Sequence, residues 1–114
     1  MANTFKRATK SSLLTTDVTS DSATTILTAT GTSTLVIIGM ASSNKISTSA
    51  TVNIYLKTAS GDSTFLIKNA PVPAGSTFEY CAGNKIIVGT GDSIRASSNT
   101  ATAIDLTISY LEQS

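Results

Sequence analysis

The sequence predicts an all-β protein, an antiparallel β-sandwich of about eight strands that is jelly-roll-like and preceded by an extended N-terminal arm. Apolar and polar residues alternate with a period of two in several segments, which is typical of strands with one buried face. Turn-forming clusters of Gly, Asn, Asp and Pro separate these segments at short intervals. Threonine, a β-branched residue that favours strands over helices, accounts for 20 of the 114 residues.

The predicted strands follow from this alternation. Val52, Ile54 and Leu56 alternate with polar or amphipathic residues, and so do the apolar residues of 104–110. The segment 34–41 is apolar at both parities, which indicates a central strand covered on each side. A short extra strand is expected near 13–18. The other strands are expected at residues 24–29, 34–42, 50–58, 63–69, 76–81, 84–89, 92–98 and 103–112.

Turn chemistry marks the connections between these strands. Residues 59–62, 81–84 and 89–92 carry the small and glycine-containing sequences of tight turns. Pro71 and Pro73 remove two backbone donors, so we expect residues 71–75 to cross between the sheets instead of closing a hairpin. The sequence of 89–93 has glycines like those of a phosphate-binding loop, but a predicted strand follows it and not a helix, which favours a tight turn.

The chain is expected to divide into an arm, residues 1–22, and one sandwich domain, residues 23–114, because a chain of about this length usually builds one core. The arm holds the basic residues Lys6, Arg7 and Lys10 and is the candidate partner-contact segment. Its alternative interpretation is a solvated tail. On this view, deleting residues 1–10 leaves the sandwich folded and weakens its incorporation into an assembly.

The composition argues against an enzyme, a metal site or a cofactor. The chain has no histidine, the commonest general base and metal ligand, and its single cysteine, Cys81, cannot form an internal disulfide. The pairs Asp17 and Asp21, and Asp62 and Asp92, lack the spacing of a calcium loop and are interpreted as turn and cap residues. We therefore expect no catalytic residue, no bound metal and an inert, part-buried Cys81.

Targeting and nucleic-acid signals are also weak. The longest apolar run, residues 35–41, has seven residues, and a bilayer span needs about 20. No signal peptide is recognisable, so we expect synthesis in a cytoplasm and no membrane partner. Residues 11–114 carry five basic and seven acidic residues, which offers no broad electrostatic footprint for nucleic acid.

The expected surface is unusually poor in charge. Only 13% of the residues are charged, and the outward strand positions are mostly Thr, Ser, Asn and Ala. Soluble monomers usually guard their sheets with Lys and Glu, whereas subunit interfaces are depleted of charge. We therefore expect the sandwich to pack against copies of itself or a larger assembly. Tyr55 and Tyr80 are the candidate interface aromatics, and a sugar-binding platform is their alternative role.

The order of several segments resembles small virion structural proteins of tailed bacteriophages, of the capsid decoration or cement, neck or tail accessory type. The likeness runs over about residues 23–112 and is carried by residues 34–42, 51–56, 69–76, 83–88, 91–95 and 103–112.

The resemblance implies a β-sandwich without enzymatic activity or cofactor. Such a protein is made in the host cytoplasm and stabilises the virion by contacts with other virion proteins of the capsid, neck or tail. It also implies a homo-oligomer, by analogy a trimer. The alternative is a carbohydrate-binding or host-surface adhesion module on a phage tail or fibre, with Tyr55 or Tyr80 stacking on a sugar.

Overall fold

The computed structural model describes residues 3–13, 15, 25–80 and 85–113, and all regular secondary structure in these residues is β-strand. The eight strands expected between residues 24 and 112 are confirmed, with ends that differ by a few residues, and a ninth precedes them. The extra strand expected near 13–18 lies largely outside the described residues. The strands are β1 (Asn3–Lys10), β2 (Thr25–Thr28), β3 (Thr34–Asn44), β4 (Ala50–Lys57), β5 (Ser63–Val72), β6 (Thr77–Tyr80), β7 (Ile86–Val88), β8 (Ser93–Ser98) and β9 (Ile104–Gln113).

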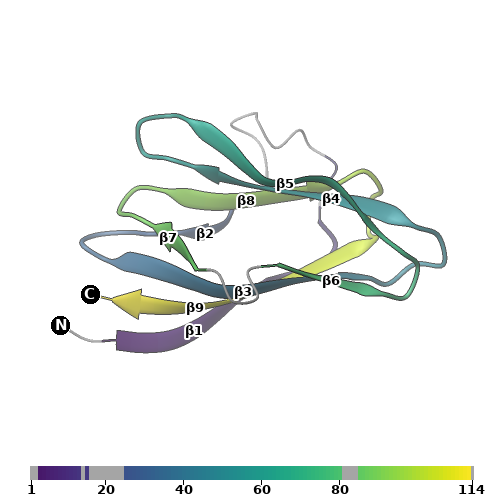
Figure 1. Ribbon diagram of the computed structural model, residues 1–114, viewed down its shortest axis with the longest axis horizontal. Coiled ribbons are helices and arrows are strands. Elements are labelled where there is room, and N and C mark those ends of the chain that lie inside the picture. The colour runs from purple at the N-terminus through teal and green to yellow at the C-terminus, as the bar shows by residue number, and fades with distance from the viewer. Residues whose placement is uncertain (1–2, 14, 16–24, 81–84, 114) are drawn as a thin grey trace.

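The strands form two antiparallel sheets that pack face to face, which confirms the predicted sandwich (Figure 1). The five-stranded sheet has the order β1-β9-β3-β6, with β7 pairing the other half of β3, and the four-stranded sheet has the order β2-β8-β4-β5. The pairs β1–β9, β2–β8, β3–β6 and β4–β5 are nested around the β4–β5 hairpin. This nesting is the jelly-roll arrangement, as the sequence predicts.

The described part of the expected arm belongs to the sandwich. Strand β1 pairs with β9 over its whole length, from Asn3 opposite Gln113 to Lys10 opposite Leu106. Just beyond β1, the side chain of Leu13 is fully buried and its backbone N–H donates to the Ile104 carbonyl oxygen at 2.8 Å. Residues 3–13 are therefore not a separate arm, and the expected boundary at residue 22 falls outside the described residues.

The two prolines lie where the chain changes sheets, as predicted. Strand β5 ends at Val72 in the four-stranded sheet, and β6 begins at Thr77 in the five-stranded sheet. Pro71 is tolerated because β5 is an edge strand, where a missing donor costs no interior ladder bond. The connection turns through a bond from the Ser76 N–H to the Pro73 carbonyl at 3.0 Å.

The hydrophobic core fills the space between the sheets, and strand β3 contributes to it from one face only. Leu35, Ile37 and Met40 are buried, whereas Ile38 is 38% exposed. Ile38 follows the buried Ile37 and points outward, and a β-bulge between Ile37 and Gly39 inserts one extra residue opposite β9, so that Met40 returns to the core. The expectation that 34–41 is covered on both sides is therefore wrong for the isolated chain.

Candidate contact face

The outer face of the five-stranded sheet holds the exposed large hydrophobic side chains of the described residues. Phe5 on β1 is 77% exposed, Ile87 on β7 is 56% exposed, and Ile38 on β3 is 38% exposed. These three strands belong to one sheet, and the described part of the four-stranded sheet exposes no comparable side chain. A cluster of this kind on one face of a small domain marks a contact surface.

Strand register places apolar residues side by side across this face. Phe5 pairs with Leu111, Leu111 pairs with Val36, and Val36 pairs with Ile87. Residues paired across a ladder point to the same face, so the four side chains form one line perpendicular to the strands. We call Phe5, Leu111, Val36 and Ile87 the apolar row.

A shallow hollow lies next to the apolar row and extends the apolar surface. Ile38 on β3 and Phe5 on β1 both line it, and Ser109 lines it from β9, the strand between them. Its lining residues are Phe5, Lys6, Arg7, Ile38, Ser109 and Tyr110. A side chain docked there would contact the carbon atoms of Ile38 and Phe5, and the Arg7 guanidinium would lie nearby.

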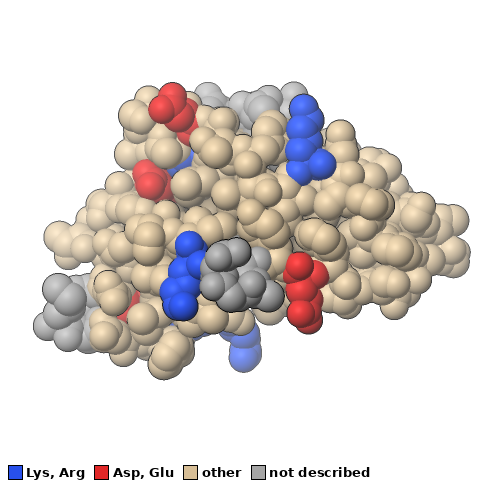
Figure 2. Space-filling view, viewed as in Figure 1, with Lys and Arg blue, Asp and Glu red and all other residues tan. Residues whose placement is uncertain are grey.

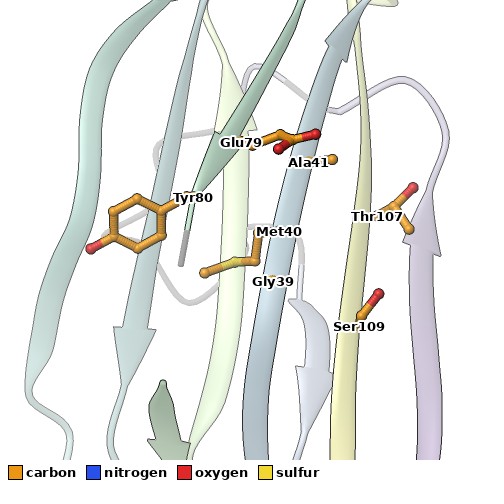
Figure 3. Close-up of a pocket in the computed structure, with 7 residues that line it drawn as sticks. All are labelled: Gly39, Met40, Ala41, Glu79, Tyr80, Thr107 and Ser109. Atoms are coloured by element: carbon orange, nitrogen blue, oxygen red, sulfur yellow. The ribbon is translucent and has the colours of Figure 1, made fainter. Parts of the chain in front are cut away.

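Small residues occupy the middle of the same face. Ser109 pairs with Gly39, and Thr107 pairs with Ala41, which itself pairs with Glu79 on β6. Figure 3 shows Ala41, Glu79, Thr107 and Ser109 directed to one side of the strands. They border a second hollow of about 240 Å³. Because these side chains are short, another protein surface can approach the sheet closely.

Charged side chains are few on this face. Asp105 lies on the interior strand β9, where it forms an ion pair with Lys45 at 2.8 Å, and the exposed Lys85 precedes β7 at the parity of Ile87. Arg7 lies on the β1 edge and Glu79 on the β6 edge, and both side chains are exposed. Neither makes an ion pair within the part of the chain that the structure describes. Figure 2 shows that charged side chains are isolated on the pictured surface, most of which is uncharged.

Of the three basic residues predicted for partner contact, only Arg7 lies on the contact face. Lys6 points to the opposite side of β1, where its Nζ donates to the Glu112 Oε1 at 2.8 Å. That hydrogen bond and the charge of Glu112 raise the pKa of Lys6 above its usual value. Lys10 is half-buried opposite Leu106. Partner contact by Lys6 and Lys10 stays a prediction.

Neither tyrosine singled out in the sequence lies on the contact face. Tyr55 is fully buried on the four-stranded sheet, with its ring centroid 5.8 Å from that of Phe65. Its hydroxyl has no hydrogen-bond partner among the described residues. Tyr80 pairs with the buried Met40 and packs against the core, and Figure 3 shows both directed away from Glu79 and Thr107. Contact of Tyr55 or Tyr80 with a partner or with a sugar stays a prediction.

The glycine-rich segment 89–93 is a tight turn, as predicted. The Asp92 N–H donates to the Gly89 carbonyl at 2.9 Å, and the Asp92 carboxylate accepts from the Gly89 N–H at 3.1 Å and the Ala59 N–H at 2.9 Å. Asp92 thus acts as a turn residue. Asp17, Asp21 and Cys81 lie outside the described residues.

The described residues lack two further features. They contain no cluster of three or more His, Cys, Asp and Glu side chains placed to hold a metal ion. They also contain no helix with the length and apolar character needed to cross a bilayer.

Sequence reasoning missed the residues that build the apolar row, although two signals were present. Leu111 directly follows the alternating series that ends at Tyr110, so its parity is that of the outer face. Ile86, Ile87 and Val88 are apolar at both parities of a three-residue strand. Phe5 gave no such signal because it is flanked by polar and charged residues. Only the register shows that these side chains align.

The sequence matches no protein-family model, whereas the fold is similar to a solved structure. No curated protein matches the sequence either. The fold is similar to a chain in the cryo-EM structure of the giant freshwater prawn Macrobrachium rosenbergii extra small virus (XSV) VLP, with a TM-score of 0.40 and 9% sequence identity, over 100% of this chain and 81% of that chain.

Proposed function

We propose that this protein is a non-enzymatic structural component of a tailed-phage virion. It acts as a decoration, cement or connector subunit that is made in the host cytoplasm and stabilises the particle by contacts with other virion proteins. The observation that carries the proposal is the contact face, where Phe5, Ile38 and Ile87 are all exposed on one sheet. The sequence segments that resemble phage virion proteins support the same function.

The mechanism is the burial of this face against another protein. Burying an exposed side chain such as Phe5 or Ile87 contributes about 1.5–3 kcal/mol. The small residues between them allow close approach, and the low charge of the sheet keeps the desolvation cost small. On a particle with many equivalent sites, modest contacts of this kind reinforce one another when a subunit binds through more than one of them.

The proposal is tested first by location. Particles of the virus that encodes this chain, purified by density gradient, should contain the protein in stoichiometric amounts by mass spectrometry. A cryo-EM map of those particles should show a jelly-roll density with the outer face of its five-stranded sheet against another protein. A protein that is abundant in the lysate and absent from purified particles would contradict the proposal.

A matched pair of variants tests the role of the contact face. Ile87→Asp places a carboxylate in the apolar row, whereas Thr64→Asp places the same group at an exposed strand position of the four-stranded sheet. We expect the first variant to be depleted from particles at least about tenfold, the loss that one buried apolar contact predicts, and the second to be incorporated normally. Equal incorporation of both variants would remove the contact face from the proposal.

A further inference from the structure

We propose that the free edge of strand β1 binds an extended segment of another protein, which adds a strand to the five-stranded sheet. The segment carries an apolar residue and, two residues away from it, a carboxylate. This inference goes beyond the virion role and does not rest on it. Strand β1 is the last strand of its sheet and, among the described strands, pairs only with β9. Figure 1 shows it at the outer border of the molecule.

The main chain of β1 carries a second set of hydrogen-bonding groups along its free side. In an antiparallel pair, alternate residues of each strand direct their N–H and C=O groups to the partner, and the residues between them direct theirs to the other side. Strand β1 has 8 residues and pairs with β9 at every one of them without a register shift. About half of its backbone groups therefore point away from the sheet. Residues 3–7 are all exposed, so another chain can reach this side of the strand.

The other edge strands are poor templates for strand addition. Strand β5 carries Pro71, which lacks a backbone donor, and Asn69, which has a positive φ of 52°. Strand β2 has 4 residues with a register shift between Thr25 and Leu27, and β6 and β7 have 4 and 3 residues. Short, bulged or proline-containing edges prevent pairing with other chains. Of the described edge strands, β1 is the one that combines length with regular pairing.

The charges of β1 determine which strand it accepts. Residues 3–10 contain Lys6, Arg7 and Lys10 and no carboxylate. Cations at a sheet edge oppose pairing with neutral or basic strands, because they would lose water or repel one another. The β1 strand of a second copy would bring the same three cations to the pair, so self-pairing through this edge is disfavoured. A strand that carries carboxylates turns the repulsion into attraction.

Phe5 and Arg7 set the positions of the side chains that the added strand needs. Both point to the outer face of the sheet, two residues apart on β1, and Phe5 is 77% exposed. Arg7 is exposed and makes no ion pair with the described residues, whereas Lys6 is already paired with Glu112 at 2.8 Å. On an added strand, the residues beside Phe5 and Arg7 also lie two apart on the outer face. An apolar residue beside Phe5 and a carboxylate beside Arg7 are therefore complementary to this edge.

A short capped peptide with the sequence Thr-Glu-Thr-Val-Thr-Glu-Thr is the probe. Its Glu, Val and Glu share one face of an extended chain, so a glutamate lies beside Arg7 when the valine lies beside Phe5, in either strand direction. Titration of the peptide into isotope-labelled protein, followed by amide NMR signals, should shift the signals of residues 3–7 most. A control peptide with Lys in place of Glu should bind at least about fivefold more weakly, because each attraction becomes a repulsion.

Two N-methylated versions of the glutamate peptide separate strand addition from binding to the face of the sheet. One version is methylated on the backbone nitrogens of its threonines, and the other on those of its glutamates and valine. Each thus loses the donors along one side of the extended chain and keeps those along the other side. Strand addition uses the donors of one side only, so one version should lose binding and the other should keep it. A peptide held by its side chains alone would bind alike in both versions.

A matched pair of variants tests the role of Arg7. Arg7→Glu should reverse the preference, so that the lysine peptide binds more tightly than the glutamate peptide. Lys68→Glu changes a cation to a carboxylate at an exposed position of β5, in the other sheet, and should leave the preference unchanged. Equal binding of the glutamate and lysine peptides, or no shift of the β1 signals at millimolar glutamate peptide, would overturn the proposal. So would β1 signals that shift with protein concentration alone, because they would assign the edge to a second copy.

Discussion

Gly91 lies so close to Ala59 that a β-carbon added to Gly91 would stand 2.8 Å from the β-carbon of Ala59. The two residues belong to the loops before β8 and before β5, which meet at one end of the sandwich. Gly91 has φ of +87°, and its N–H donates to the Ala29 carbonyl at 2.9 Å. Backbone conformation and close approach therefore both require glycine at this position.

We expect Gly91→Ala to lower the free energy of unfolding by about 2–4 kcal/mol, because it combines left-handed backbone strain with a steric overlap. Urea unfolding measures the loss. Gly61→Ala is the control, since Gly61 has φ of +101° and nothing within 4 Å of an added β-carbon. That variant should cost only the strain, about 1 kcal/mol. Ala59→Gly should partly rescue Gly91→Ala, and equal losses in Gly91→Ala and Gly61→Ala would contradict the close approach.

Asn44 provides a second prediction, because its buried amide joins three pieces of backbone. Its Nδ2 donates to the carbonyls of Thr48 and Val72 at 2.9 Å each, and its Oδ1 accepts from the Ile46 N–H at 3.0 Å. Asn44 is only 3% exposed, so Asn44→Ala leaves the carbonyls of Thr48 and Val72 and the Ile46 N–H without this partner in a buried environment. We expect a loss of about 3 kcal/mol.

The control for Asn44 is its neighbour on β3. Ser43→Ala removes a hydroxyl whose bond to Thr77 is exposed, at 3.1 Å, and should cost less than about 1 kcal/mol. Both free energies come from urea unfolding followed by circular dichroism. Similar losses in the two variants would show that the Asn44 amide does not hold the end of β5 to the loop after β3.

Asp105 should make the stability depend on pH. Its carboxylate accepts from Lys45 Nζ and the Ser12 N–H, both at 2.8 Å, and these contacts lower its pKa below the usual value of 3.8. A pKa lowered by folding means that Asp105 stabilises the protein above pH 3.8 and that this contribution is lost as the pH falls through the folded-state pKa.

Asp105→Asn tests that pH dependence. At pH 7 the variant should be less stable by at most about 1 kcal/mol, because the Asp105 side chain is 43% exposed and the ion pair is screened. The difference from the parent protein should vanish toward pH 2. Thermal unfolding of both proteins across this range measures it, and a difference that persists unchanged at pH 2 would assign the effect to something other than the carboxylate charge.

Deleting residues 1–10 should unfold or strongly destabilise the sandwich, which reverses the expectation drawn from the sequence. The deletion removes β1 and uncovers β9, whose Leu106 and Ile108 are at most 1% exposed. We expect a loss of about 3 kcal/mol or more. The double variant Lys6→Ala and Lys10→Ala keeps the strand and should stay folded. A truncated protein with unchanged thermal stability would show that β1 is dispensable.

The positions of strands β2 to β9 were predictable because each has a signal in its own sequence, either apolar alternation or flanking turn residues. Val52 and Ile54 alternate with their neighbours, and the prolines at 71 and 73 mark the change of sheet. Strand β1 gave no such signal. It lies at a sheet edge, and all of its first five residues are exposed. Packing in the core therefore does not impose an apolar alternation on its sequence.

The contact face was not predictable because it is a property of register. Phe5 and Leu111 are 106 positions apart in the sequence and become neighbours only through the β1–β9 ladder. The bulge at Ile38 adds a second difficulty, since one inserted residue reverses the parity of everything after it on β3. The low overall charge correctly indicated a surface that is poor in ions, and the positions of its apolar members required the structure.

The strand order β1-β9-β3 has a consequence for how the chain acquires this fold during synthesis. Strand β9 is the last of the nine to leave the ribosome, and it must insert between two strands that are made much earlier. Until then β3 lacks one ladder partner and β1 lacks its ladder entirely, so the five-stranded sheet is completed only after β9 has been made. Pairing between strands so distant in the sequence is slow. At high expression, the folding rate and not the stability should therefore limit the yield of folded protein.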